Sequence, residues 1–356
     1  GGRYLTANSY PKILLVCNQR IYDTYVAPEE VRRLEKFSTF EWLLYEDDNN
    51  FDKESRTSKF LESISSVNGL IISHGSPTIN SEIMDATSNL KIIGELEDDR
   101  FANRVDLEAA WKRNICTVDT TNGSSYPVSE WALALILISL RNAGAQFRRI
   151  IAGHTKMDPD AFKYAGGLLV RKRVGLIGCG HMGRRLMKYL QPFETEIWVY
   201  DPYLPREMAE SLGFLQTSLE NILSKCQVIV CLAPLTPKTR GMIGENELNR
   251  IPSGAVLVNV SRGAIINSEA LIERLKRGDI IAGLDVFDPE PIPPDSEILH
   301  LPNVFITPHF AYFTGNQYRE SFGLMVDELD RFFHGHETFF DLTSRSLANR
   351  RGIDSD

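Results

Sequence analysis

The stretch Val174-Gly-Leu-Ile-Gly178-Cys-Gly180-His-Met-Gly183 runs from an apolar strand pattern into three spaced glycines. A helical pattern, Arg184–Leu190, follows at once, so the order is strand, turn and helix. Gly178 permits a tight turn, Gly180 lets the backbone approach a ligand, and Gly183 lets the helix pack close to the strand. The helix N-terminus adds free N–H groups and a positive dipole end, which together favour an anionic ligand.

An acidic residue follows at the spacing that a dinucleotide-binding unit requires. The next strand, EIWVY, ends in Asp201, 18 residues past Gly183. A carboxylate there accepts hydrogen bonds from the adenosine ribose hydroxyls and repels a 2′-phosphate. We therefore predict a site for NAD(H), with NADP(H) less favoured. Two interpretations compete with this one: the glycines form a purely structural turn, or nearby Arg206, otherwise a solvated loop charge, blurs the preference for NAD.

Short apolar runs alternate with amphipathic stretches along most of the chain, which predicts parallel sheets covered by helices on both faces. In the first third, we expect strands over 12–17, 69–73, 90–94 and 115–118. Later strands are expected over 174–178, 196–200, 227–232, 255–260, 280–286 and 304–307. An amphipathic helix is expected over about 315–333. A chain of 356 residues is long enough for two such α/β domains.

The overall composition excludes several classes of partner. A formal net charge of −8 provides no basic field for nucleic acid or an anionic membrane. The longest apolar run, 131–140, is half the length that a membrane span needs. The cysteines form no CxxC pair and no metal-ligand spacing, and they lie at positions 17, 116, 179, 226 and 231. We expect buried free thiols, no metal site and a reducing compartment, the cytoplasm.

Three polar residues lie just past predicted strand ends, where ligands bind in open α/β sheets. Arg262 follows AVLVNVS, Glu290 follows IAGLDVF in the loop DPEPIPP, and His309 follows VFITP. Each alone is typical of a surface loop, a loop turn or a cap. Because they end three successive strands beside a dinucleotide site, we expect them to form one catalytic group.

The chemistry of these three side chains matches the reduction of a 2-oxo acid. Hydride that arrives at the carbonyl carbon leaves negative charge on oxygen, which a protonated His309 neutralises by donating its proton. A nearby carboxylate favours the charged imidazole, and Glu290 fits that role. Arg262 offers paired donors for the substrate carboxylate and polarises the carbonyl.

Over residues 65–335, the chain resembles the D-isomer-specific 2-hydroxyacid dehydrogenase family. The segments that carry the resemblance are VGLIGCGHMGRRL, VYDPYLP, CLAPLTPKTRGMIG, LVNVSRGAIIN, AGLDVFDPEP and LPNVFITPHFA. The family's catalytic arginine, glutamate and histidine fall on Arg262, Glu290 and His309. Its carboxamide-binding aspartate corresponds to Asp285, and its ribose-binding acid to Asp201. The resemblance implies further cofactor contacts at His181, Met182, Ala233, Pro234, Thr239, Val260 and Ser261.

The resemblance also implies the domain plan. We predict a discontinuous, flavodoxin-like substrate domain over residues 3–141 and 311–356, since the C-terminal helix returns to it. A Rossmann-type NAD-binding domain is predicted over residues 142–310, with the substrate cleft between the two domains. Family members commonly form homodimers through their cofactor domains, so we expect a homodimer.

The first domain departs from the family pattern near the predicted substrate loop. Ser73, His74, Gly75 and Ser76 correspond to the loop whose backbone N–H groups hold the substrate carboxylate. Relatives usually carry a glycine-rich stretch similar to GxGxDNID after the strand LKIIG, and this chain has an acidic stretch over 95–106 instead. Either this acidic loop changes what binds, or it is a solvated turn in which Arg100 pairs with its acidic neighbours.

Three other functions share parts of this pattern. A corepressor-like protein that senses NAD(H) can keep the same fold and the same three residues. A phosphoglycerate dehydrogenase-like enzyme is a second alternative, although such relatives often carry an arginine where this chain has Ser73. Formate dehydrogenases are a third, but they carry glutamine beside the histidine, and Glu290 argues against them.

Overall fold

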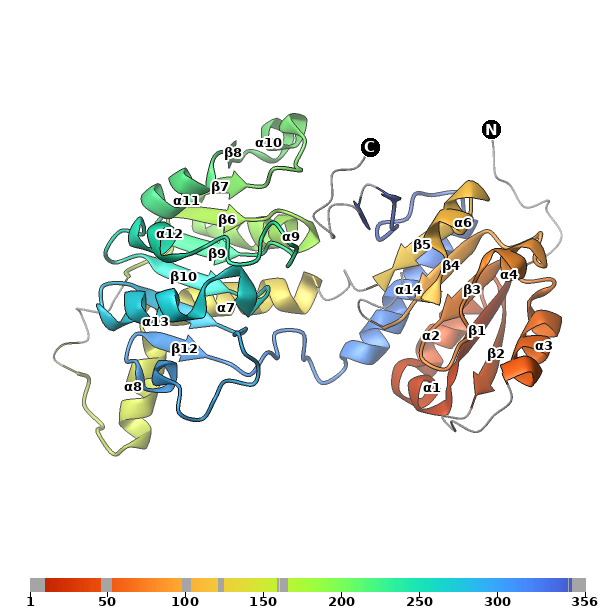
Figure 1. Cartoon of the computed structure of the whole chain (residues 1–356), viewed down its shortest axis with the longest axis horizontal. Coiled ribbons are helices and arrows are strands. Elements are labelled where there is room, and N and C mark those ends of the chain that lie inside the picture. Colours follow the sequence, from red (N-terminus) through yellow and green to blue (C-terminus); the bar gives the residue numbers. More distant parts are fainter. Residues whose placement is uncertain are drawn as a thin grey trace. The chain divides into compact units, whose positions relative to one another are not determined.

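The computed structural model describes residues 10–45, 53–97, 104–120, 125–158, 160, 166–344 and 346–347. The chain divides into two compact units (Figure 1). Of the described residues, those within 1–124 and 314–347 form unit 1, and those within 125–313 form unit 2. Each unit has its own parallel sheet, so the predicted class of two doubly wound α/β domains is confirmed.

Unit 1 has a five-stranded parallel sheet in the order β2-β1-β3-β4-β5, the flavodoxin-like arrangement. Its strands are β1 (Lys12–Asn18), β2 (Thr39–Tyr45), β3 (Gly69–Ile72), β4 (Ile92–Glu95) and β5 (Cys116–Asp119). Its helices are α1 (Gln19–Tyr25), α2 (Pro28–Leu34), α3 (Lys53–Ile64), α4 (Ser81–Asp85), α6 (Leu107–Lys112) and α14 (Gln317–Phe333). Figure 1 shows α14, drawn in blue, beside strands from the other end of the chain.

Alternating side chains of β1 build two cores, one on each face of this sheet. Ile13 and Leu15 join a cluster with α1, α2 and α14, whereas Leu14 and Val16 join a cluster with α3, α4 and α6. A strand that is apolar on both faces is typical of a parallel sheet buried between helices. The carboxyl ends of its strands therefore provide the accessible edge on which a site can form.

Unit 2 has a seven-stranded parallel sheet in the order β12-β11-β10-β9-β6-β7-β8. Its strands are β6 (Arg173–Ile177), β7 (Glu196–Tyr200), β8 (Leu215–Gln216), β9 (Val228–Cys231), β10 (Val256–Asn259), β11 (Ile281–Leu284) and β12 (Val304–Ile306). Its α-helices are α7 (Ser125–Leu140), α8 (Ala143–Ile151), α9 (His181–Leu190), α10 (Arg206–Leu212), α11 (Leu219–Lys225), α12 (Glu245–Asn249) and α13 (Ser268–Lys276). Short 3₁₀ turns are η3 (Gln191–Phe193), η4 (Gly263–Ile265) and η5 (Glu297–His300). The sheet order reverses between β6 and β9, where dinucleotides bind in Rossmann-type sheets.

The boundary between the units lies earlier than the predicted position at 141/142. Helix α7 belongs to unit 2, because Ala132, Leu135 and Ile136 share one buried cluster with residues of β6, β9 and β10. The sequence assigned this helix to the first domain because it ends just before a less apolar stretch. The second crossing also differs slightly, since unit 1 resumes at Thr314 and not at residue 311.

Two strands were not predicted, and both lie at sheet edges. In β2, the side chains at Thr39, Glu41 and Trp42 are exposed, so the strand lacks the continuous apolar run that marked the others. Strand β8 has only two residues. The other strands lie within two residues of their predicted bounds.

The cysteines of the chain are free thiols. Four are buried and Cys116 is half-buried, which confirms the prediction for the four. Burial raises the pKa of the Cys231 thiol to about 12. Among the described residues, none of the helices combines the length and apolar character needed to cross a bilayer.

Candidate active site

The glycine turn after β6 has the backbone geometry that the sequence predicted. Gly178 has a φ of +88°, and a Cβ atom there would lie 2.7 Å from the Cα of Ala233. A side chain is therefore excluded both by conformation and by the neighbouring loop. Helix α9 begins at His181, and the buried Gly183 lies in its first turn. The turn thus directs the N-terminus of a ten-residue helix toward the carboxyl edge of the sheet.

Asp201 connects this turn to the end of β7. One of its carboxylate oxygens accepts a hydrogen bond from the Cys179 N–H at 2.9 Å, and the other accepts one from the Tyr203 N–H at 2.9 Å. Its side chain remains half-buried. The carboxylate is therefore fixed beside the glycine turn, at the position where it can also accept from a ribose hydroxyl.

The residues at this edge fit a dinucleotide. An added Cβ atom on Gly180 would meet no heavy atom within 4 Å, so the turn leaves room for a diphosphate next to the α9 N-terminus. The neighbouring loop after β9 is held by Thr239, whose hydroxyl donates to the Pro234 carbonyl at 2.6 Å and accepts from the Thr236 N–H at 2.8 Å. The other residues predicted to contact the cofactor lie in the same unit. His181 and Met182 begin α9, Ala233 lies in the loop after β9, and Val260 and Ser261 follow β10.

The predicted acid–base pair is formed in unit 2. Nδ1 of His309 lies 2.7 Å from Oε2 of Glu290, and the other oxygen of Glu290 accepts from the Phe287 N–H at 2.7 Å. The side chains of His309 and Glu290 are 40% and 33% exposed, so a small molecule can reach the imidazole. Because Nδ1 faces the carboxylate, Nε2 is the nitrogen that remains for proton exchange.

Asp285 holds the turn that carries His309. The Asp285 side chain is fully buried, and its carboxylate accepts from the Thr307 hydroxyl at 2.6 Å and from the N–H groups of Phe310 and Ala311 at 3.0 Å each. His309 has a φ of +53°, which is unfavourable for a residue with a side chain. The three hydrogen bonds to Asp285 stabilise this conformation. The observed contacts of the Asp285 carboxylate are thus with the turn that carries His309. The contact with the cofactor that the family resemblance implies stays a prediction.

Arg262 is exposed and lies in the loop after β10. The Asn259 amide donates to the Arg262 carbonyl at 3.1 Å and accepts from the Ser261 N–H at 3.1 Å. Gly263 packs directly on the next loop, because a Cβ atom there would lie 2.0 Å from the carbonyl carbon of Phe287. The Arg262 loop is therefore packed against the loop that holds Glu290.

The predicted substrate loop of unit 1 follows β3. Ser73 is fully buried and its hydroxyl has no hydrogen-bond partner among the described residues, whereas His74 is exposed. Gly75 has a φ of +96° and lies against Asn18, whose N–H donates to the His74 carbonyl at 2.7 Å. Ser76 donates its N–H to Ser73. The loop is thus held in a tight turn on the carboxyl edge of the sheet.

The comparisons with known proteins give a consistent result. Residues 133–311 match the model of the D-isomer specific 2-hydroxyacid dehydrogenase NAD-binding domain. The chain is 32% identical over 279 residues to a D-3-phosphoglycerate dehydrogenase of Methanocaldococcus jannaschii, covering 78% of this chain and 52% of that one. It is 30% identical over 292 residues to a mitochondrial formate dehydrogenase of Solanum tuberosum, covering 80% and 75%.

The chain belongs to the D-isomer specific 2-hydroxyacid dehydrogenase family. A crystal structure of a phosphoglycerate oxidoreductase from Rhizobium etli shares the fold, with a TM-score of 0.80 at 22% identity, covering 93% of this chain and 98% of that one. The chain spans about half the length of the phosphoglycerate dehydrogenases that it matches.

Several residues that shape this family site were not identified from the sequence. Asn259 and Thr307 position Arg262 and Asp285, and each is a polar residue at the end of an apolar strand, which was a usable signal. Glu97 and Arg104 lie on the unit 1 loop after β4, and nothing in their spacing showed that they would pair.

The alternative prediction of a solvated turn over 95–106 is wrong at Glu95, because that side chain is fully buried. Its predicted ion-pairing residue, Arg100, lies outside the described residues. Among the described residues, no cluster of three or more His, Cys, Asp or Glu side chains is arranged for a metal ion.

Proposed function

We propose that this chain is an NAD-dependent oxidoreductase that interconverts a small D-2-hydroxy acid and its 2-oxo acid. The observation that carries the proposal is the 2.7 Å contact between His309 and Glu290, in the same unit as the dinucleotide turn and next to the Arg262 loop. A histidine held by a carboxylate on one nitrogen is suited to donate a proton from the other. Family membership supports the D configuration.

The glycine turn and Asp201 would hold NADH, which would supply the hydride in the reducing direction. His309 donates its Nε2 proton to the oxygen of the reacting carbonyl, and Glu290 stabilises the imidazolium before the transfer. Arg262 binds the substrate carboxylate and polarises the carbonyl with its planar donors. The loop from Ser73 to Ser76 holds the substrate carboxylate with backbone N–H groups. In the oxidising direction, His309 accepts the proton of the hydroxyl.

The cofactor is proposed to be NAD(H). The Asp201 carboxylate, fixed by two backbone N–H groups, would repel the 2′-phosphate of NADP(H). Arg206 is exposed at the start of α10.

A homodimer is proposed on the basis of an apolar surface in unit 2. Helix α8 exposes Phe147, Ile150 and Ile151, which are 65%, 58% and 72% exposed and share one helical face. Large apolar side chains grouped in this way are typical of an interface. Light scattering should give twice the mass of the chain, and Phe147→Glu should give the mass of one chain.

The free thiols fit a reducing compartment such as the cytoplasm.

Three alternatives compete with this proposal. The match to formate dehydrogenases would favour formate as the substrate. Formate oxidation, however, needs no proton donor, whereas the contact with Glu290 favours His309 as a proton donor. A corepressor-like sensor would bind NADH without turnover. The match to phosphoglycerate dehydrogenases makes phosphohydroxypyruvate a required test substrate.

The test is NADH oxidation with glyoxylate, pyruvate, hydroxypyruvate, phenylpyruvate, 2-oxoisocaproate and phosphohydroxypyruvate, with NADPH in parallel and formate with NAD in the reverse direction. We expect turnover of at least one 2-oxo acid with NADH, and Arg262→Ala should abolish most of it while NADH fluorescence titration still shows binding. Binding of NADH without turnover of any acid would favour the sensor. Turnover of formate alone would contradict the assignment.

A further inference from the structure

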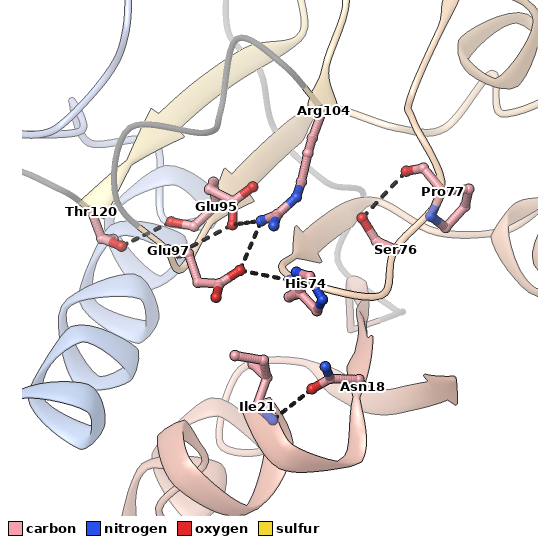
Figure 2. A network of polar contacts seen from close by, with 9 residues as sticks. All are labelled: Asn18, Ile21, His74, Ser76, Pro77, Glu95, Glu97, Arg104 and Thr120. Atoms are coloured by element: carbon pink, nitrogen blue, oxygen red, sulfur yellow. Dashed lines mark hydrogen bonds and ion pairs between the residues drawn. The ribbon is translucent and has the colours of Figure 1, made fainter. Parts of the chain in front are cut away.

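A carboxylate of the protein itself occupies the predicted anion-binding loop of unit 1. Oε2 of Glu97 accepts a hydrogen bond from the His74 N–H at 2.9 Å and one from the Arg104 guanidinium at 2.9 Å (Figure 2). Both donors converge on one oxygen atom. The arrangement is the one that a carboxylate ligand would adopt between a backbone N–H group and a guanidinium.

The surroundings of Glu97 are built from several elements of unit 1. Glu95, at the end of β4, pairs with the same guanidinium nitrogen of Arg104 at 2.8 Å, and its Oε1 also accepts from the Glu97 N–H at 3.1 Å. Figure 2 shows Arg104 reaching across to both glutamates, with His74 beside the same oxygen of Glu97. The side chains of Glu95, Arg104 and Glu97 are 0%, 13% and 18% exposed. The guanidinium is therefore fixed in a largely buried position and does not sample solvent freely.

The loop keeps unused donor and acceptor capacity around this carboxylate. The Gly75 N–H, which is the next amide in the turn, donates to no backbone carbonyl of the described residues. The buried Ser73 hydroxyl and Oε2 of Glu95 also have no hydrogen-bond partner among those residues. Buried polar groups are normally satisfied, so these atoms indicate a polar site beyond the internal contacts.

Glu97 is the main negatively charged partner of Arg104 in this cluster. Burial raises the pKa of the Glu95 carboxyl to about 7, although Arg104 opposes this rise. Near neutral pH, a substantial share of the Glu95 side chains is therefore protonated. Glu97 is then the principal negative charge that faces both Arg104 and the His74 N–H.

We propose that Arg104 and the His74 N–H form a specificity site for the anionic group of the substrate, and that Glu97 is its displaceable internal ligand. This inference rests on the proposed function, since it assigns the substrate loop of that enzyme. A small 2-oxo acid must compete with Glu97 for these donors. The chain therefore selects substrates whose anionic group binds strongly enough to replace a carboxylate, and it binds weaker anions poorly.

The test measures binding of oxalate by calorimetry to the free and to the NADH-loaded full chain. Glu97→Gln keeps the size of the side chain and removes its charge, so we expect oxalate to bind about tenfold more tightly, a gain of about 1.4 kcal/mol. Arg104→Gln should weaken binding, and the double variant should lose the gain. If Arg104→Gln does not fold, Arg104→Lys, which keeps the charge without the planar fork, should bind oxalate more weakly than the unmodified chain.

A matched control removes a carboxylate from another arginine pair of the same unit. Asp85 pairs with Arg113 at 2.8 Å on the surface, so Asp85→Asn should leave oxalate binding unchanged. Unchanged or weaker oxalate binding in Glu97→Gln would overturn the proposal, because a merely structural glutamate predicts that result. Retention of the full gain in the double variant would also overturn it.

The outcomes separate this inference from the proposed function. If the unmodified chain reduces 2-oxo acids but Glu97→Gln does not tighten oxalate binding, only the specificity site is wrong. If Glu97→Gln and Arg104→Gln change oxalate binding in opposite directions while no variant uses NADH, the anion site stands and the proposed function is wrong.

Discussion

A glutamate is paired with a cationic or protonatable side chain at the carboxyl edge of each sheet, but the two pairs differ in burial. In unit 2, Glu290 contacts His309, and both side chains are more than 30% exposed. In unit 1, Glu95 and Glu97 share Arg104, and the three side chains are less than 20% exposed. An exposed imidazole can exchange a proton with a small molecule, whereas a permanently charged guanidinium can only bind one.

The difference follows from the elements that support each pair. The buried Asp285 carboxylate holds the His309 turn through its backbone N–H groups, so the imidazole is not needed to stabilise the turn. In unit 1, Glu95 and Glu97 instead form ion pairs with Arg104 directly, at 2.8 and 2.9 Å. The two proposals therefore place acid–base chemistry in unit 2 and anion selection in unit 1.

The largest effect should come from the proposed acid. His309→Ala removes the proton donor, and we expect turnover to fall by about 10²–10⁴-fold. NADH binding should persist, because the glycine turn and Asp201 are unchanged. Stopped-flow turnover and NADH fluorescence titration measure the two quantities. Full activity of this variant would show that another group is the acid.

The partner of His309 should have a smaller effect. Glu290→Gln keeps the hydrogen bond to the Phe287 N–H but no longer stabilises an imidazolium, so kcat should fall by roughly 10–100-fold. KM for the 2-oxo acid should change little, since Glu290 does not hold the substrate. A rise in KM at constant kcat would instead assign Glu290 to substrate binding.

The packing between the two loops can be broken without touching a catalytic side chain. In Gly263→Ala, the new Cβ atom would clash with the Phe287 backbone, and overpacking of this kind costs about 1–3 kcal/mol. We expect lower stability in urea and turnover reduced by about tenfold, because the Glu290 loop must move. The control is Gly213→Ala, where φ is +72° but no atom lies within 4 Å of the Cβ. This control should lose stability and keep its turnover; equal loss of turnover in both variants would contradict the loop coupling.

The smallest effect concerns the buried carboxyl of unit 1. Burial raises the pKa of Glu95 from 4.5 to about 7, so the folded state holds the proton more tightly than the unfolded chain does. Stability from this group is therefore greatest below the unfolded value and falls as pH rises through the folded one. Between about pH 6 and about pH 8, the free energy of unfolding should fall by about 1.4 kcal/mol more in the unmodified chain than in Glu95→Gln. Urea titrations at both pH values measure this difference. An equal change in the free energy of unfolding in both proteins would contradict the raised pKa.

The strength of each sequence signal explains which parts of the molecule were predicted. Buried strands such as β6 and β9 carry continuous apolar runs, and Gly178, Asp201, Glu290 and His309 lie at fixed positions after strand ends. Strand β2 was missed because edge strands expose half of their side chains. The domain boundary was misplaced because α7 is apolar around its whole circumference, so its pattern does not show which sheet it covers.

The unit 1 cluster was not predictable for a different reason. Glu97 and Arg104 are paired through the geometry of the loop, and loop geometry has no periodic signal in the sequence. The acidic stretch was recognised as a departure from the family, but a run of charges is usually solvated. The structure shows instead that Glu95 is fully buried and that Glu97 pairs with Arg104.

The most direct test of the central claim follows the hydride. The chain is incubated with NADH that carries deuterium at both C4 positions and with the 2-oxo acid that it reduces fastest, and the product is analysed by chiral chromatography and mass spectrometry. We expect a 2-hydroxy acid of D configuration with one deuterium at C2. A product of L configuration, a product without deuterium, or no consumption of NADH with any 2-oxo acid would contradict it.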